Sequence, residues 1–249
     1  MSALKRFFVE QIGDTATLTG EEFEHAKNVL RLGVGDEVIL LDNSGKEYTC
    51  IVATVEKKSM LLNVLGVAEG DKEAQTPVAL AFGYLKNADK NEFIVQKAVE
   101  LGVKEIIAFS SEYSSAFMNE NKLERLNKVS KESAKQCLRS FAPTVRYAKT
   151  LKDALELLQG YNNKLFACEF ALESQADVNT LNGSTAMVVG SEGGFSKAEE
   201  TLANSLGFSS VTLGKRILRA ETACVALTSI VMFSLGELGE NSTKCRGQV

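Results

Sequence analysis

The chain has 249 residues, 45% of them apolar, and a formal net charge of −4 at pH 7. No window approaches the roughly 18–20 uninterrupted apolar residues of a membrane span, and the first residues lack the apolar run of a secretory signal. We therefore expect a cytoplasmic protein without membrane contact. A single histidine and five scattered cysteines, without a C-x-x-C pair, argue against a metal site, a catalytic triad and a disulfide framework.

The first 73 residues are expected to form a small β domain. A short helix is predicted within residues 19–36, capped by Thr19 or Gly20 and ended by Gly33 and Gly35. Three runs rich in Val, Ile and Leu follow between residues 36 and 69, separated by turn compositions at 43–45 and 57–59. A helix followed by short strands indicates a small barrel.

Residues 68–77 are polar, lack periodicity and end in proline, so we expect a linker there and a second domain over residues 74–249. From Val78 onward, strand and helix patterns alternate, which predicts a mostly parallel sheet covered on both faces. Strands are expected at 78–85, 104–111, 164–170, 186–190 and 209–214. Helices are expected at 90–102, at 120–140, from Ser196 onward and at 223–235.

A glycine-rich turn, GSEGG at 190–194, ends one of these strands, and Ser196 with Glu199 forms a capping box that starts a helix. Adjacent glycines let a ligand approach the backbone and leave N–H groups free to donate. The turn is neither a Walker loop nor a G-x-G-x-x-G motif. Because Glu192 would repel phosphate, a neutral or cationic ligand is favoured. The alternative is a tight connection that holds no ligand.

A second strand ends in a glycine turn at Leu213 and Gly214, followed by a loop with Arg216 and Arg219 and by an apolar helix. If the two strands are neighbours, their turns build one pocket, since ligands bind beyond the carboxyl ends of parallel strands. The alternative for both arginines is a solvated loop. The apolar helix is expected to be buried on nearly all sides, in the core or in a subunit interface.

Positive charge is concentrated in residues 122–152, which hold 9 basic and 2 acidic side chains. Five of the basic residues recur every three or four positions and would form one stripe on a helix: Arg125, Lys128, Lys131, Lys135 and Arg139. A polyanion such as RNA is a reasonable partner for this stripe. A solvated helix face is the alternative.

Several motifs occur together in one order along the chain. They are RFFV near the start, HAKNVLRLGVGD at 25–36, NEFIVQKAVELGVKEI, ESAKQCLRSFAPTV, VVGSEGGFSKAEE at 188–200 and LGKRILRAETA at 213–223. Together they resemble the ribosomal RNA small subunit methyltransferase E family, which methylates N3 of a uracil in 16S rRNA and belongs to the knotted SPOUT superfamily. The chain departs from the usual family wording at Ser191 and Lys215, where proline is common, and at Ala88, where glycine is frequent.

The resemblance implies an α/β fold, with a C-terminal SPOUT-type parallel sheet that contains a deep trefoil knot and an N-terminal PUA-like β-barrel that binds RNA. It implies S-adenosylmethionine as cofactor, a homodimer, and 16S rRNA or the small ribosomal subunit as partner. The cofactor-binding residues implied are Gly190, Glu192, Gly193, Gly194, Leu213, Gly214, Ile217, Leu218, Thr222 and Ala223.

Direct displacement at the cofactor methyl group needs no metal, but the uracil N3 must lose a proton, and nearby positive charge would stabilise the developing anion. By resemblance, Arg219 and Arg216 are assigned to catalysis, with Glu221 orienting an arginine. In addition to the basic stripe, Arg6, Lys27 and Arg31 are assigned to RNA binding, whereas His25 is expected to be structural.

Three other functions compete with this interpretation. A related knotted methyltransferase could act on tRNA or on a ribose hydroxyl. A non-enzymatic RNA-binding or ribosome-assembly factor could retain a decayed pocket, for which Ser191 and Lys215 are the only hints. A nucleotide-dependent oxidoreductase is disfavoured by the lack of a G-x-G-x-x-G motif.

Overall fold

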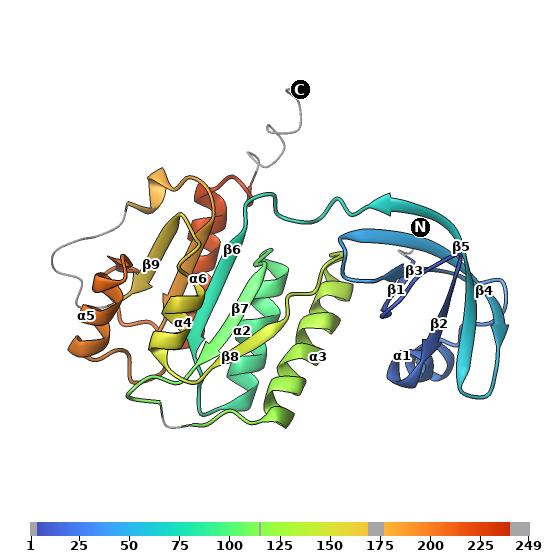
Figure 1. Cartoon of the computed structure of the whole chain (residues 1–249), viewed down its shortest axis with the longest axis horizontal. Helices are drawn as coiled ribbons and strands as arrows, with labels where there is room; N and C mark the ends of the chain where they lie inside the picture. The colour runs from blue at the N-terminus through green and yellow to red at the C-terminus, as the bar shows by residue number, and fades with distance from the viewer. Residues whose placement is uncertain (1–3, 115, 169–176, 240–249) are drawn as a thin grey trace. The chain divides into compact units, whose positions relative to one another are not determined.

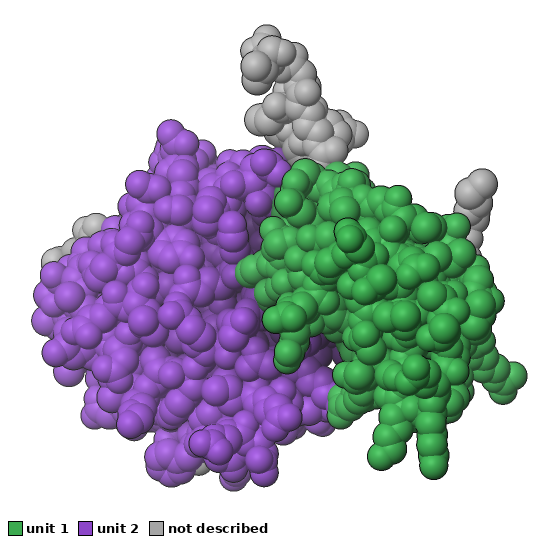
Figure 2. Space-filling view, turned by 45° about the vertical axis from the view of Figure 1, so that its right-hand side comes forward, with its two compact units in different colours: residues 1–73, 134–142 green, residues 74–133, 143–249 purple. Residues whose placement is uncertain are grey.

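The computed structural model describes residues 4–114, 116–168 and 177–239, and the chain divides into two compact units (Figures 1 and 2). Unit 1 comprises residues 1–73 and 134–142, and unit 2 comprises residues 74–133 and 143–249. Unit 1 therefore includes a segment that lies far along the chain from the N-terminal residues. Within the described ranges, the helices are all too short or too polar to span a bilayer.

Unit 1 is built on a curled five-stranded sheet, which forms a half-barrel (Figure 1). Its strand order is β1-β3-β4-β5-β2, with β1 parallel to β3 and the other pairs antiparallel. The strands are β1 (Lys5–Phe8), β2 (Thr15–Thr19), β3 (Glu37–Leu41), β4 (Lys46–Val55) and β5 (Ser59–Glu69). The three strands expected between residues 36 and 69 are confirmed as β3, β4 and β5.

The helical segment of unit 1 is shorter than the sequence predicted. The α-helix α1 (Gly20–Glu24) begins after Thr19 and passes directly into a π-helix, η1 (His25–Val29). The wider turn is closed by the amide of Leu30, which donates to the carbonyl oxygen of His25 at 3.0 Å. The backbone then turns left-handed at Arg31, with φ of 56°. The expected continuation to Gly33 was wrong because the helix ends before this left-handed residue.

Unit 2 contains a six-stranded sheet in which every pair is parallel, as the alternating pattern predicted. The strand order is β11-β9-β10-β6-β7-β8, so β10 lies between β6 and β9. The strands are β6 (Val78–Gly83), β7 (Glu105–Phe109), β8 (Val145–Ala148), β9 (Asn163–Ala167), β10 (Thr185–Val189) and β11 (Ser209–Val211). The four-residue β8 was not predicted, and residues 169 and 170 of the expected 164–170 strand lie outside the described residues. The trefoil knot stays a prediction.

Helices cover both faces of this sheet (Figure 1). On one face, α4 (Leu151–Leu157) and α5 (Lys197–Ser205) pack into a core that includes Ile107, Phe166 and Val188. On the other, α2 (Ala88–Glu100) packs against α6 (Ala220–Ser234), which contacts β6 and β10. A short 3-10 helix, η2 (Val178–Thr180), also contacts α6.

One helix ends earlier than predicted, and another is partly exposed in the single chain. Helix α3 (Glu120–Gln136) ends four residues early, and Leu138 just beyond it has a left-handed backbone with φ of 64°. Helix α6 was expected to be buried on nearly all sides, in the core or in a subunit interface; in the single chain Phe233 is 63% exposed and Ile230 is also exposed, and the interface stays a prediction. One side of α6 therefore presents apolar side chains to solvent.

Candidate active site

A cavity of about 450 Å³ lies beyond the carboxyl ends of β9, β10 and β11. Its walls are the ends of these strands, the two glycine turns, Lys90 of α2 and the first turn of α6. In the sequence analysis, a pocket shared by the two turns was expected if their strands were neighbours. In the structure β9 lies between β10 and β11. The turns nevertheless meet in one cavity, because the ends of all three strands contribute to its wall.

The turn after β10 is held tightly by its backbone. The amide of Gly194 donates to the carbonyl oxygen of Ser191 at 3.0 Å, and Gly194 has a left-handed φ of 67°. A Cβ atom on Gly190 would lie 3.1 Å from the carbonyl carbon of Gly194. A Cβ atom on Gly83, at the end of β6, would lie 2.4 Å from the nitrogen of Ser191. A side chain at Gly83 would therefore collide with the turn, one at Gly190 would crowd it, and Gly194 has a φ that other residues rarely adopt.

The sequence suggested that Gly193 lacks a side chain to let a ligand approach, but in the structure the residue next to it is Tyr113. A Cβ atom there would lie 2.6 Å from Cβ of Tyr113, which belongs to the loop between β7 and α3. The missing side chain therefore makes room for this loop as well as leaving the cavity wall open. A substitution by valine at Gly193 would displace Tyr113, so it would not test cofactor contact alone.

The β7–α3 loop, described over residues 110–114 and 116–119, is fastened to the glycine turn and to helix α5. The hydroxyl oxygens of Ser111 and Ser191 are 3.3 Å apart. The amide of Glu112 donates to Oε1 of Glu199 at 2.9 Å, while Oε2 of Glu199 accepts from the amide of Ser196. The predicted capping box is confirmed, and its glutamate also holds the loop.

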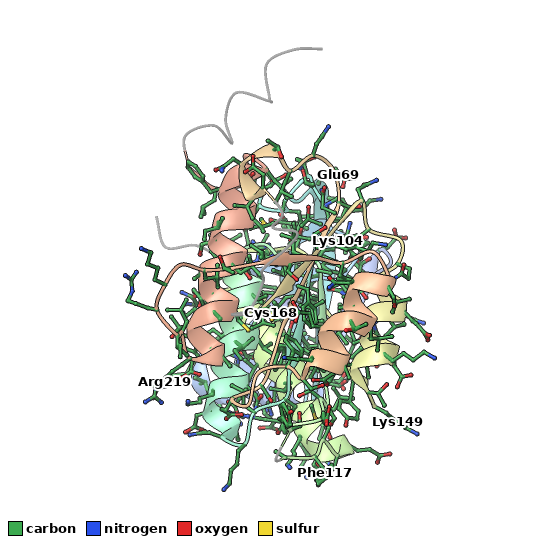
Figure 3. All side chains as sticks on the ribbon, turned by 90° about the vertical axis from the view of Figure 1, so that its left-hand side faces the viewer. Glu69, Lys104, Phe117, Lys149, Cys168 and Arg219 are labelled. Atoms are coloured by element: carbon green, nitrogen blue, oxygen red, sulfur yellow. The ribbon has the colours of Figure 1, made fainter. Side chains whose placement is uncertain are left out.

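The second turn carries the two arginines. Gly214 has a left-handed φ of 91°, and a Cβ atom there would meet nothing within 4 Å. Arg216 and Arg219 both line the cavity and are exposed, as is Ile217, which is 86% accessible to solvent. Figure 3 shows Arg219 at the margin of the unit, with its side chain directed away from the sheet. The arginines are therefore accessible to a substrate that approaches the cavity from solvent.

Glu221 is paired with a lysine. Its Oε1 atom lies 2.9 Å from Nζ of Lys90, whereas Oε2 is buried without a hydrogen-bond partner among the described residues. Burial acts to raise the pKa of Glu221, but the hydrogen bond and charge of Lys90, with a smaller contribution from Arg219, lower it below its ordinary value. Lys90 holds one oxygen of the carboxylate and Arg219 contributes to its electrostatics, so the expectation that Glu221 orients an arginine stays a prediction.

The cavity contains nearly all of the residues that the sequence analysis assigned to cofactor binding or catalysis. Thr222 is the exception, since it is exposed and does not line the cavity. The sequence analysis missed several lining residues: Lys90, Ala167, Cys168, Val189, Ser191, Phe195, Val211, Thr212 and Ala220. Most of these lie next to predicted residues, but Lys90, Ala167 and Cys168 come from distant segments and carry no local signal.

The predicted basic stripe is interrupted. Arg125, Lys128 and Lys131 are exposed on α3, and Arg125 donates two hydrogen bonds of 2.9 Å to Glu92. Lys135 is largely buried and lies 3.0 Å from Glu22. Arg139 lies beyond the helix, is 3% exposed and forms an ion pair of 2.7 Å with Glu73. The stripe was extended too far because the helix ends before Arg139.

The remaining predicted RNA-binding residues lie in unit 1. Arg6 donates to Glu47 at 3.3 Å, and Nζ of Lys27 donates to the carbonyl oxygen of Glu56 at 3.2 Å. Arg31 is exposed. His25 is partly buried, and its ring lies edge-on to Phe7. Among the described residues, no group of three or more His, Cys, Asp or Glu side chains is placed to hold a metal ion.

Comparison with known proteins gives consistent matches along the chain. Residues 72–232 match the family described as RNA methyltransferase domain, and residues 18–65 match the RNA methyltransferase PUA domain. The Ribosomal RNA small subunit methyltransferase E of Bacillus subtilis is 31% identical over 92% of this chain and 96% of its own. The protein of the same name from Mesomycoplasma hyopneumoniae is 33% identical over 89% and 96% of the two chains.

Two solved structures are similar over nearly the whole chain. A Ribosomal RNA small subunit methyltransferase E from Neisseria gonorrhoeae, bound to S-adenosyl methionine, has a TM-score of 0.83, 28% identity, and coverage of 94% of this chain and 98% of its own. A methyltransferase from Legionella pneumophila, in complex with the cofactor SAM, has a TM-score of 0.83, 26% identity, and coverage of 93% and 98%.

Proposed function

We propose a specific reaction for this chain from the premise that it belongs to the ribosomal RNA small subunit methyltransferase E family. The chain is an RNA methyltransferase that uses S-adenosylmethionine, and its proposed target is N3 of a uridine in 16S rRNA. The observation that carries the proposal is the cavity at the carboxyl ends of β9, β10 and β11, which both family-like glycine turns line. Because ribosomal RNA is the substrate, we place the enzyme in the cytoplasm.

The residues of the cavity fit the cofactor. A volume of about 450 Å³ is in the range of small-molecule sites. Backbone groups of the two turns can pair with an adenine, and apolar side chains such as Val189, Leu213 and Leu218 can contact its face. Glu221 is paired with Lys90, but the carboxylate of Glu192 in the turn after β10 suits a cationic or neutral group there better than a phosphate.

When bound, S-adenosylmethionine supplies a methyl group on a cationic sulfur. The electron pair of the deprotonated uracil N3 forms the new bond to the methyl carbon, while the bond between carbon and sulfur breaks and its electrons return to sulfur. The protein must hold the two reactants in line, and orientation alone contributes several kcal/mol. We assign to Arg219, with Arg216 beside it, the stabilisation of negative charge on the uracil as N3 releases its proton to solvent water before the methyl group is transferred.

Lys90 and Glu221 have a supporting role in this proposal. The ion pair joins the first turn of α2 to the first turn of α6, both of which border the cavity. Since Glu221 follows Arg219 by two residues, the pair fixes the end of the arginine loop. We infer that Lys90 and Glu221 position this loop and do not exchange protons with the substrate.

RNA contact is assigned to both units. In unit 2, the exposed face of α3 offers the positive charge of Lys128 and Lys131 to phosphates, together with Arg125, which is also paired with Glu92. In unit 1, Arg31 is exposed and available, whereas Arg6 and Lys27 already have partners within the unit. The exposed apolar side of α6, with Ile230 and Phe233, supports the homodimer that the family resemblance implies.

The test is methyl transfer from labelled S-adenosylmethionine to small ribosomal subunits or bare 16S rRNA that lack the modification, followed by nucleoside digestion and mass spectrometry. We expect 3-methyluridine. We also expect Arg219→Ala to lower kcat by about 100-fold, because it removes a charge that stabilises the transition state. Lys215→Ala is the matched control, since Lys215 is exposed in the same loop but does not line the cavity.

The outcomes separate the competing functions. A different methylated nucleoside would retain the fold and cofactor but change the target. Absence of transfer together with intact RNA binding would favour an RNA-binding or assembly factor over an enzyme. Equal losses in the Arg219 and Lys215 variants would contradict the role assigned to Arg219.

A further inference from the structure

The β7–α3 loop exposes two aromatic side chains, and one of them, Tyr113, lies against Gly193 in the cavity wall. Tyr113 is 52% exposed and Phe117 is 76% exposed. Figure 3 places Phe117 at the same end of unit 2 as Arg219, beyond the sheet. Exposed rings of this size are the kind of side chain on which proteins stack unpaired nucleobases.

Tyr113 is held in place although its ring is exposed. Its Cβ and backbone lie against Gly193, the preceding amide is bound by Glu199, and Ser111 contacts Ser191. At the far end of the loop, Nζ of Lys122 donates to the carbonyl oxygen of Phe117 at 2.7 Å. A ring on a fixed backbone loses little freedom when it binds a partner, which favours binding.

The charges around Tyr113 favour a base over a phosphate as the bound group. Glu112 and Glu192 are exposed beside it, and Glu199 lies behind the loop. Three carboxylates at this position repel the phosphate backbone, whereas the face of a nucleobase is uncharged. Two cations of the cavity wall that could hold phosphates, Arg216 and Arg219, lie on its other turn, whereas Lys86 is exposed beside Glu192, whose Oε1 accepts from the Lys86 amide at 3.3 Å.

The proposed reaction requires an unpaired strand at this place. N3 of uracil is on the edge used in base pairing, so the target must leave any duplex before it can be methylated. Its neighbours in the strand then lose a stacking partner. Gly193 lines the cavity but Tyr113 does not. The Tyr113 ring therefore lies outside the cavity that the target base must enter.

We propose that Tyr113 stacks on the nucleobase that flanks the target uracil, and so keeps the substrate strand open at the mouth of the cavity. This inference rests on the proposed function, because it takes the substrate to be RNA. It assigns to the β7–α3 loop a part in substrate recognition, with Ser191 and Glu199 as the residues that position the loop.

The experiment compares Tyr113→Leu with Tyr113→Phe in the full chain. The probe is a 16S rRNA transcript that lacks the modification, and affinity is measured by filter binding at low and at high salt. We expect Tyr113→Leu to weaken binding about tenfold, the loss typical of one stacked base. The factor should be the same at both salt concentrations, because stacking releases no counterions. Tyr113→Phe, which keeps the ring, should bind like the parent.

Three results would overturn the inference. They are full RNA affinity in Tyr113→Leu, an equal loss in Tyr113→Phe, and a loss of S-adenosylmethionine affinity in Tyr113→Leu by calorimetry. The last would assign Tyr113 to packing against Gly193. Failure of the proposed function would be seen separately, as the absence of 3-methyluridine in the products of the parent enzyme.

Discussion

Replacing Glu73 by glutamine is expected to destabilise unit 1 by removing the group that holds residues 134–142 in it. Nε and Nη2 of Arg139 donate to Oε2 of Glu73 at 3.1 and 2.7 Å. The amides of Ser140 and Phe141 donate to Oε1 at 3.2 and 3.1 Å. One carboxylate therefore serves a guanidinium and two backbone donors that are separated from it by more than 60 residues.

The magnitude follows from what glutamine keeps and loses. Its oxygen can still accept from the two amides, but its NH₂ group would face the donors of Arg139, so the charge-assisted bonds are lost. A single bond to a charged group contributes about 1.5–3 kcal/mol, and breaking a buried ion pair costs about 3–5 kcal/mol. Arg139 is 3% exposed, whereas water partly reaches Glu73. We therefore expect a loss of about 3 kcal/mol in the free energy of unfolding.

The assay is urea denaturation followed by circular dichroism, with hydrogen exchange at the amides of Ser140 and Phe141 as a local measure. Glu69→Gln is the matched control, because Glu69 is exposed at the end of β5 and should change stability by about 0.5 kcal/mol or less. A difference below about 1 kcal/mol between the two variants would refute the reasoning. Unchanged exchange at Ser140 and Phe141 would refute it as well.

Three further predictions concern the cavity and the RNA surface. Lys90→Met should raise the pKa of Glu221 and lower stability by about 1 kcal/mol at neutral pH. The lowered pKa of Glu221 contributes stability above its ordinary value of 4.5, and this contribution disappears as the pH falls through the folded-state pKa. The difference in unfolding free energy between Lys90→Met and the parent should therefore be smaller at about pH 3 than at neutral pH. Equal differences at the two pH values would contradict the prediction. Lys131→Glu should reduce the salt slope of RNA binding by about 1 and leave cofactor affinity unchanged, and an unaltered slope would count against an RNA contact. Gly214→Ala should weaken S-adenosylmethionine binding in calorimetry, because alanine is strained at the φ of 91° that Gly214 adopts. Gly66→Ala is the control, since Gly66 has an ordinary φ and open space around it, and this variant should bind the cofactor normally. Equal affinities of the two variants would show that the turn tolerates the strain.

Features that depend on neighbouring residues were predictable from the sequence. The capping box of Ser196 and Glu199 spans three positions, and its helix begins where expected. The two glycine turns and the loop arginines were found in the same way, and they line one cavity. The family resemblance added the cofactor and the reaction, which no local pattern contains.

Features that depend on distant residues were not predictable. Lys90 and Glu221 are separated by 131 positions, and nothing in either segment indicates the other. The spacing of Arg139 fits the helical stripe. The left-handed backbone at Leu138 turns the chain, however, and the side chain of Arg139 is buried in unit 1. The position of β9 between β10 and β11 is likewise a property of the assembled sheet.

The central position of β10 has a consequence for synthesis of the chain. Val78 of β6 pairs with Thr185 of β10, so one edge of β6 stays without its partner while about a hundred further residues are made. At 5–20 residues per second, this interval is about 5–20 s. During it β6 and β9 must not pair with each other, because β10 later occupies the space between them. The cofactor cavity therefore cannot form while the first two thirds of the chain emerge from the ribosome. It can form only after the last third, which contains β10 and β11, has emerged.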